Sequence, residues 1–223
     1  MPEPGGMEAE RLHKLSQYIL KRKNLHVATL HHKSEYGPYV RQVFELINAA
    51  YAPLYGVVEL SDAQIERYAK KFIPLVDPEF VCFVLDEQEN LVAFGVTTLD
   101  PSVALKHSDG RLFPFGWAGV LNDLHHGDTL IMLLTAVRPD LQTEGINAVM
   151  MDHVCQSCNR HGVRFAETGP MLEKNDHILA QWKRLEKEQH KRRRCFIKDL
   201  DHDVNAANAA AAQTETPETE SAE

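Results

Sequence analysis

The sequence predicts an α/β protein of the α+β type, in which one mixed sheet has helices on both faces. Three observations support this fold class. Two helical patterns precede a pair of strand patterns, and the chain then alternates strand, helix, strand, helix and strand. A continuous apolar run at 128–137 is typical of a strand covered on both faces. We therefore expect the order β-α-α-β-β-β-α-β-α-β over residues 24–200, preceded by an extra N-terminal helix.

Apolar spacing and helix caps define the elements of the first half. After Tyr36, apolar residues recur at helical spacing as far as Tyr51. Ser61 and Gln64 stand three residues apart and form the capping box of a second helix, whose apolar residues share one inward face. The remaining expected elements are a helix over 7–22 within an N-terminal extension 1–23, and strands over 24–30, 80–87 and 91–99, the last two forming a hairpin.

Residues 101–127 form a long connection that is too apolar to be a disordered linker, so part of it should be helical or packed. It contains Phe113, Phe115 and Trp117. These aromatic side chains either line the site of an acceptor molecule or pack the connection shut, and packing is the expected role.

The last third alternates strands and helices. The helix after the apolar strand ends near Gly162, where glycine favours a helix C-terminus. A short strand, VRFAETGP, follows it. Asn175 is a suitable cap for the next helix. The segment CFIKDL at 195–200 is expected to close the sheet as its final strand.

Charge is distributed unevenly along the chain. The formal net charge is −8, but residues 201–223 contain six acidic side chains and no Lys or Arg. The remainder is close to neutral, which disfavours a general nucleic-acid-binding surface. The 201–223 tail has too few large apolar groups to offset its chain entropy, so we expect it to be disordered.

Membrane and disulfide signals are weak, and we expect no membrane partner. The longest apolar run is much shorter than the roughly 20 residues that span a bilayer, and the N-terminus lacks the features of a secretory signal. Four scattered cysteines indicate a reducing cytoplasm rather than a disulfide scaffold. Cys155 and Cys158 lie near two histidines, but a zinc site normally joins two separated ligand pairs, so we expect buried helix cysteines and no metal.

The stretch TAVRPDLQTEGINAVM at 135–150 joins the apolar strand to the following helix. Its glycine, Gly145, has two interpretations. It either relieves a tight corner or removes a Cβ so that an anion can approach the first turn of the helix, where unpaired N–H groups attract phosphate. The residues whose amides can face outward in this way are Gln142, Thr143, Glu144, Gly145, Ile146 and Asn147.

The element order and the stretch Val137–Ala148 together resemble the GNAT superfamily of N-acetyltransferases. That family marks its pyrophosphate loop with Gln or Arg, two residues, Gly, one residue, and Gly or Ala. Gln142 and Gly145 match this pattern, whereas Asn147 stands where Gly or Ala is usual. Asn175 and Trp182 occupy the positions of a helix-start Asn and a thiol-contacting Tyr. The ending HKRRRCFIKDL is similar to that of a poorly characterised bacterial branch.

The resemblance implies transfer of an acetyl group from acetyl-CoA to an amine whose identity the sequence does not give, and it leaves a homodimer open. Two residues depart from the family. Glu144 places a carboxylate beside the expected pyrophosphate, and it should weaken CoA binding unless it turns away. Trp182 has an indole N–H, which cannot protonate a leaving thiolate near neutral pH.

Direct acyl transfer also needs a donor to the thioester carbonyl and a general base. We expect the carbonyl donor to be a backbone N–H near Ala136 or Val137, where the family's fourth strand bulges. Glu167 is the first choice for the general base and Glu173 is the second.

Two further groups of residues have open roles. Asp123, His125 and His126 precede the central strand and are expected to be exposed rather than catalytic. The basic segment 183–194 is either a solvated helix end or a surface for the CoA 3′-phosphate or for an RNA or acidic partner, of which RNA is disfavoured by the near-neutral body. The alternative to an enzyme is a GNAT-fold module without turnover, which holds CoA or docks a partner through this segment.

Overall fold

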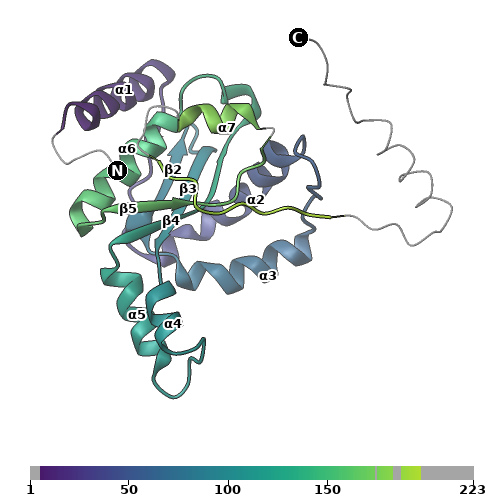
Figure 1. The fold of residues 1–223 in the computed structure, drawn as a ribbon. Helices are drawn as coiled ribbons and strands as arrows, with labels where there is room; N and C mark the ends of the chain where they lie inside the picture. The colour runs from purple at the N-terminus through teal and green to yellow at the C-terminus, as the bar shows by residue number, and fades with distance from the viewer. Residues whose placement is uncertain (1–5, 174, 183–186, 197–223) are drawn as a thin grey trace, which may run out of the picture. The chain divides into compact units, whose positions relative to one another are not determined.

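A five-stranded mixed sheet forms the centre of the computed structural model, which describes residues 6–173, 175–182 and 187–196 (Figure 1). The strands lie side by side in the order of the chain. The first three pairings are antiparallel, and only the last is parallel. The strands are β1 (His26–Val27), β2 (Val81–Leu85), β3 (Leu91–Leu99), β4 (Thr129–Val137) and β5 (Phe165–Thr168).

Seven α-helices and four short 3-10 helices accompany the sheet in the described ranges. The α-helices are α1 (Met7–Lys23), α2 (Gly37–Tyr51), α3 (Asp62–Phe72), α4 (Ser102–His107), α5 (Gly116–His126), α6 (Asn147–His161) and α7 (Asp176–Gln181). The 3-10 helices are η1 (Lys33–Tyr36), η2 (Ile73–Leu75), η3 (Pro78–Phe80) and η4 (Pro139–Leu141). This mixed sheet with helices on both faces confirms the expected fold class.

Two apolar clusters hold helices to opposite faces of the sheet. On one face, Ile19 of α1 and Val149 and Met150 of α6 join Cys82 and Val84 of β2. On the other face, residues of α2 pack against the alternate residues of β2 and β3, such as Phe83 and Phe94. The period of two along a strand separates the clusters, because successive side chains point to opposite faces. α1 therefore belongs to the packed body and lies against α6.

The chain divides into two compact units between Asn175 and Asp176. The first unit contains the sheet and α1–α6. In the second unit, the described residues are α7, which begins directly after Asn175, then Trp182, and an exposed segment over 187–196 without helix or strand. The cap expected at Asn175 stays a prediction. The domain limits expected at 23/24 and 200/201 stay predictions.

The capping box of α3 is present, but its expected inward face is poorly covered. The Ser61 backbone N–H donates to the Gln64 side-chain oxygen at 2.9 Å. However, Tyr68 is 38% exposed and Phe72 is 48% exposed. Amphipathic spacing predicts where a helix forms, but it does not guarantee that a partner surface covers all of its apolar side.

Three expected strands differ from the structure. The strand expected at 24–30 is only His26–Val27, because it pairs with just two residues of β2. β4 is not covered on both faces along its length, since Leu133 and Leu134 are 46% and 43% exposed. At the expected closing strand, Cys195 and Phe196 are not in a strand, and residues 197–200 lie outside the described residues, as do 183–186 and the 201–223 tail.

The connection at 101–127 contains α4 and α5, which confirms its expected helical content. Among the described residues, no helix is long and apolar enough to cross a membrane.

Candidate functional site

Strands β4 and β5 separate halfway along β4. Their parallel pairing runs from Thr129 opposite Phe165 to Met132 opposite Thr168. Beyond Met132, β4 continues to Val137 with β3 as its neighbour. Leu133, Leu134 and Thr135, here named the open stretch of β4, are consequently exposed, whereas the other residues of β4 are buried or partly buried.

A β-bulge marks the point where the strands separate. Met132 pairs with Thr97 and Leu134 pairs with Val96, so Leu133 is the extra residue. A bulge leaves its extra residue outside the regular hydrogen-bond ladder. The bulge expected near Ala136 and Val137 therefore lies earlier in the strand, at Leu133. Both of those residues are buried and pair regularly with β3, because the irregularity depends on register with β3 rather than on a local sequence signal.

The hydroxyl of Tyr51 reaches the open stretch of β4. Its O–H donates to the Thr135 carbonyl oxygen at 2.7 Å. Burial raises the pKa of the Tyr51 phenol above its ordinary value, although the hydrogen bond to Thr135 partly opposes this. Sequence reasoning missed this position because Tyr51 fits the apolar spacing of α2, which predicts only a core role.

A tight turn leads from β4 into α6. The Gln142 side-chain amide donates to the Val137 carbonyl at 3.2 Å and ties the turn to the end of the strand. Gly145 has a φ of +80°, and a Cβ there would lie 3.2 Å from Cδ1 of Ile19. The backbone conformation therefore favours glycine, and a side chain here would also crowd Ile19 of α1.

The same turn presents a row of backbone donors. The Glu144 N–H bonds the Leu141 carbonyl and the Ala148 N–H bonds the Gly145 carbonyl. In the described part of the chain, the N–H groups of Thr143, Gly145, Ile146 and Asn147 have no hydrogen-bond partner. They lie at the N-terminus of a 15-residue helix, whose dipole favours an anion.

Helix α1 brings basic residues to this turn. Lys21, Arg22 and Lys23 form its last turn, and Lys23 Nζ lies 2.7 Å from a Glu144 carboxylate oxygen. Lys23, through its hydrogen bond and then its charge, lowers the pKa of Glu144, and Arg22 contributes more weakly. The pairing offsets the unfavourable carboxylate expected at this site. Sequence reasoning missed these residues, because basic groups at a helix C-terminus ordinarily complement the helix dipole.

The predicted general bases lie on two different segments. Glu167 is partly buried on β5, opposite Ile131 and one residue before the strands separate. Glu173 is exposed in the turn before Asn175. Trp182 belongs to the second unit, so the structure gives no relation between it and the turn at 142–147. The roles of Glu167, Glu173, Asn175 and Trp182 stay predictions.

A hollow of about 430 Å³ lies beside the last turns of α2. The Asn48 side chain exchanges hydrogen bonds with the backbone of Leu60 and fixes the neighbouring chain segment. Two carboxylates, Glu45 and Glu59, border the hollow. These carboxylates would suit a cationic group such as a protonated amine.

Other candidate residues have structural roles. The Asp123 carboxylate accepts the Ala104 N–H at 2.8 Å and joins α5 to α4. His125 and His126 are exposed at the end of α5, as expected. Burial raises the pKa of Cys155 to about 11 and that of Cys158 to about 12, consistent with core cysteines. Within the described ranges, no cluster of three or more His, Cys, Asp or Glu could hold a metal.

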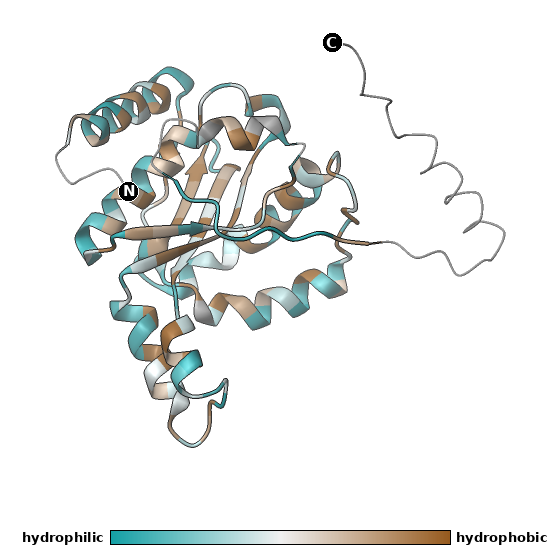
Figure 2. Cartoon of the chain, viewed as in Figure 1, coloured by the Kyte–Doolittle hydropathy of each residue, from teal (hydrophilic) through white to brown (hydrophobic). Residues whose placement is uncertain are grey.

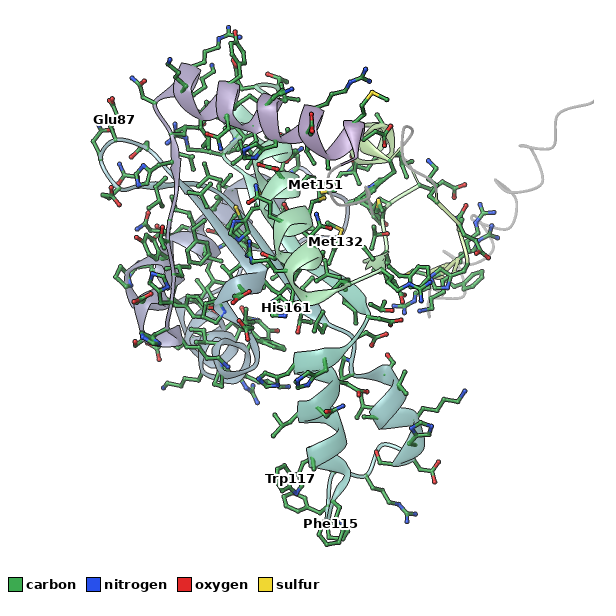
Figure 3. The ribbon with its side chains drawn as sticks, turned by 90° about the vertical axis from the view of Figure 1, so that its left-hand side faces the viewer. Glu87, Phe115, Trp117, Met132, Met151 and His161 are labelled. Carbon is green, nitrogen blue, oxygen red and sulfur yellow. The ribbon has the colours of Figure 1, made fainter. Side chains whose placement is uncertain are left out.

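The aromatic residues of 101–127 do not pack as expected. Phe113 is 83% exposed, Phe115 is 80% exposed and Trp117 is 48% exposed. Phe115 and Trp117 lie at the far end of the α4–α5 hairpin, away from Met132 of β4 (Figure 3). Hydrophobic composition alone cannot distinguish a packed loop from a projecting one.

Comparison with known proteins supports the fold. A possible acetyltransferase from Clostridium difficile 630 has a TM-score of 0.50 and 11% identity, covering 79% of this chain and 99% of that structure. An aminoglycoside acetyltransferase from an uncultured soil metagenomic sample has a TM-score of 0.52 and 13% identity, covering 80% and 99%. The chain therefore has the fold of the GNAT N-acetyltransferases.

Comparison of sequences finds similarity over a shorter part of the chain than comparison of structures does. No family model matches the chain. The "Bacterial ceramide synthase" of Caulobacter vibrioides is 31% identical over 90 residues, a stretch that is 40% of this chain and 23% of that protein. The matched stretch thus covers less than a quarter of the length of this curated relative.

Proposed function

We propose that the chain is an acyl-CoA-dependent N-acyltransferase that moves an acyl group directly from the CoA thioester to an amine. One observation carries the proposal. The strand that contains the open stretch leads through η4 into a turn in which four backbone N–H groups have no partner in the described part of the chain. A thioester beside the bulge and a pyrophosphate on the turn would use both features of one continuous segment.

The phosphates of CoA would bind the N–H groups of Thr143, Gly145, Ile146 and Asn147. The basic last turn of α1 would add charge attraction, with Lys21 and Arg22 directed to phosphate while Lys23 neutralises Glu144. Gln142, Asn147 and Ala148 would shape the turn, as the corresponding positions do in the pyrophosphate loop of the GNAT superfamily. This arrangement offsets the objection that Glu144 repels the cosubstrate.

Attack by a neutral amine on the thioester carbon would form a tetrahedral intermediate. Its oxyanion would accept a hydrogen bond from the backbone N–H of Leu133 or Leu134 at the bulge. The intermediate would then form the amide, break the carbon–sulfur bond and release the CoA thiolate. Close alignment of amine and thioester can contribute roughly 7–11 kcal/mol to such a reaction.

Two proton transfers complete the reaction. Glu167 would accept the proton that the amine loses, directly or through water, with Glu173 as the second candidate. The Tyr51 phenol is the candidate donor to the thiolate, because its hydroxyl already reaches the open stretch of β4. This role replaces the acid that Trp182 cannot supply.

Acetyl is the first proposed acyl group, with acetyl-CoA as cosubstrate. A longer fatty acyl group is a second candidate, favoured by the exposed apolar side chains of Leu133 and Leu134 beside the proposed thioester. The partial similarity to a ceramide synthase points the same way, since a ceramide is the amide of a long-chain amino alcohol. A cytoplasmic location, where the four free thiols stay reduced, accords with either donor.

The proposed function is tested by measuring the release of free CoA. The assay uses a series of acyl-CoA donors, from acetyl to long-chain, each with a panel of amines. We expect amine-dependent CoA release that Glu167→Gln lowers at least tenfold. CoA binding without release for any donor and amine would instead support the alternative of a GNAT-fold binding module.

A further inference from the structure

The α4–α5 hairpin projects away from the sheet and ends in exposed apolar side chains. Figure 3 shows Phe115 and Trp117 at its far end, and Figure 2 shows hydrophobic segments along it. We name Leu112, Phe113, Phe115 and Trp117 the apolar tip; they are 45%, 83%, 80% and 48% exposed. Scattered apolar residues are normal on a surface, whereas a group of this kind marks an interaction site.

The hairpin behind the tip is closely packed. A Cβ on Gly116 would overlap the Arg111 carbonyl oxygen, and one on Gly119 would lie 3.3 Å from the Ala104 Cβ. The Asp123 carboxylate fixes the start of α4 through the Ala104 N–H. The tip is therefore presented by a defined support, because these contacts admit only glycine or small residues.

Several polar groups at the tip have partners within the hairpin. The Trp117 N–H donates to the Leu112 carbonyl at 2.9 Å, and its indole N–H donates to the Pro114 carbonyl at 3.0 Å. The Phe115 carbonyl accepts the Ala118 N–H. Pro114 has no backbone N–H, so it has no donor that would need a partner in an apolar phase. Internal hydrogen bonds of this kind lower the penalty for moving a loop from water into an apolar phase.

Basic residues flank the tip. Lys106 and Arg111 are exposed and lie in the sequence on the two sides of the exposed Asp109, so the stretch that leads to the aromatic residues has a net positive charge. Aromatic rings favour the interface between lipid tails and headgroups, and nearby basic residues favour anionic headgroups. A projecting tip also suits a deformable lipid phase better than a protein partner, which would have to supply a matching groove.

We propose that the apolar tip inserts into the interface of an anionic bilayer and holds the protein at a membrane surface. This contact is peripheral and is independent of the acyl-transfer proposal. It differs from the sequence-based expectation of no membrane partner, which concerned a spanning segment. Lys106 and Arg111 would contact lipid phosphates, while Phe113 and Phe115 would enter the acyl region.

Flotation of the full chain with phosphatidylcholine vesicles, with and without phosphatidylglycerol, tests the proposal. We expect the protein to float with the anionic vesicles, and Phe113→Ser with Phe115→Ser to lower binding at least tenfold. Lys106→Ser with Arg111→Ser should remove the preference for phosphatidylglycerol and the sensitivity to salt. Circular dichroism shows whether each variant is folded.

Tyr55→Ser with Val58→Ser is the matched control, because these side chains are each 83% exposed outside the hairpin. This control should bind vesicles as the unchanged protein does. In a Trp182→Phe background, Trp117 fluorescence should shift to the blue with anionic vesicles. The proposal is overturned if the unchanged protein does not float, if the tip variant floats equally well, or if the tip variant changes only self-association in gel filtration.

Discussion

At the scale of single residues, the pairing of Lys23 with Glu144 sets the charge beside the proposed phosphate site. Lys23→Gln would leave the carboxylate unpaired, so we expect weaker CoA binding, whereas Glu144→Gln should strengthen it. Titration calorimetry at low and high salt measures both effects, which added salt should reduce. Lys14→Gln is the control, since Lys14 pairs with Glu10 at the other end of α1. Equal affinities in all four proteins would contradict this role.

Tyr51 allows a second test at this scale. Tyr51→Phe removes the hydrogen bond to the Thr135 carbonyl, so the free energy of unfolding should fall by about 1 kcal/mol. If the phenol also protonates the thiolate, kcat should fall at least tenfold while KM for acyl-CoA changes little. Tyr36→Phe is the control, because Tyr36 bonds the Val76 carbonyl instead. A loss of stability with unchanged kcat would leave Tyr51 with a structural role only.

At the scale of elements, α1 links the body of the fold to the turn before α6. Ile19 is 6% exposed and lies against the position that a Gly145 side chain would occupy. Ile19→Ala should lower the free energy of unfolding by about 2–4 kcal/mol, because it opens a cavity in the apolar cluster. Urea denaturation measures this change. Leu15→Ala, at a position 49% exposed on the same helix, should have little effect, and equal losses would contradict the packing account.

Elements with strong local signals could be predicted from the sequence. The apolar spacing of α2 and the Ser61–Gln64 capping box define helices that the structure contains. The strand run at 128–137 is also present as β4. Its separation from β5 and its bulge at Leu133 could not be predicted, since both depend on register with neighbouring strands. The same limit applies to Tyr51 and Lys23, whose partners lie far away in sequence.

At the scale of the whole molecule, acid should weaken the contact between Glu79 and α6. Hydrogen bonding to His161, 2.6 Å away, is the main cause that lowers the Glu79 pKa, and Arg160 adds to it. Because the pKa of Glu79 is lower in the folded protein than in the unfolded chain, the ionised carboxylate stabilises the fold at pH values above the unfolded pKa, about 4.3. This contribution disappears as the pH falls through the folded pKa. Because the Glu79 side chain is 51% exposed, solvent screening keeps the effect small.

The difference in unfolding free energy between the unchanged protein and Glu79→Gln isolates that contribution. We expect a difference near neutral pH that decreases toward zero as the pH falls below about 4. Glu87→Gln, in the turn between β2 and β3, is a control that should show no such trend. A difference that grows on acidification would have the wrong sign for a lowered pKa.

The central claim is that the turn at 142–147 binds the phosphates of an acyl-CoA, and calorimetric titration with CoA and acetyl-CoA tests it most directly. Gly145→Asp should abolish binding, because it adds a side chain and a negative charge to the turn. Gly162→Asp is the matched control: Gly162 also has a positive φ, +68°, but lies at the opposite end of α6 with open space around it. We predict micromolar binding by the unchanged protein and by Gly162→Asp, with none by folded Gly145→Asp. Undetectable binding by the unchanged protein, or equal binding by both variants, would contradict the account.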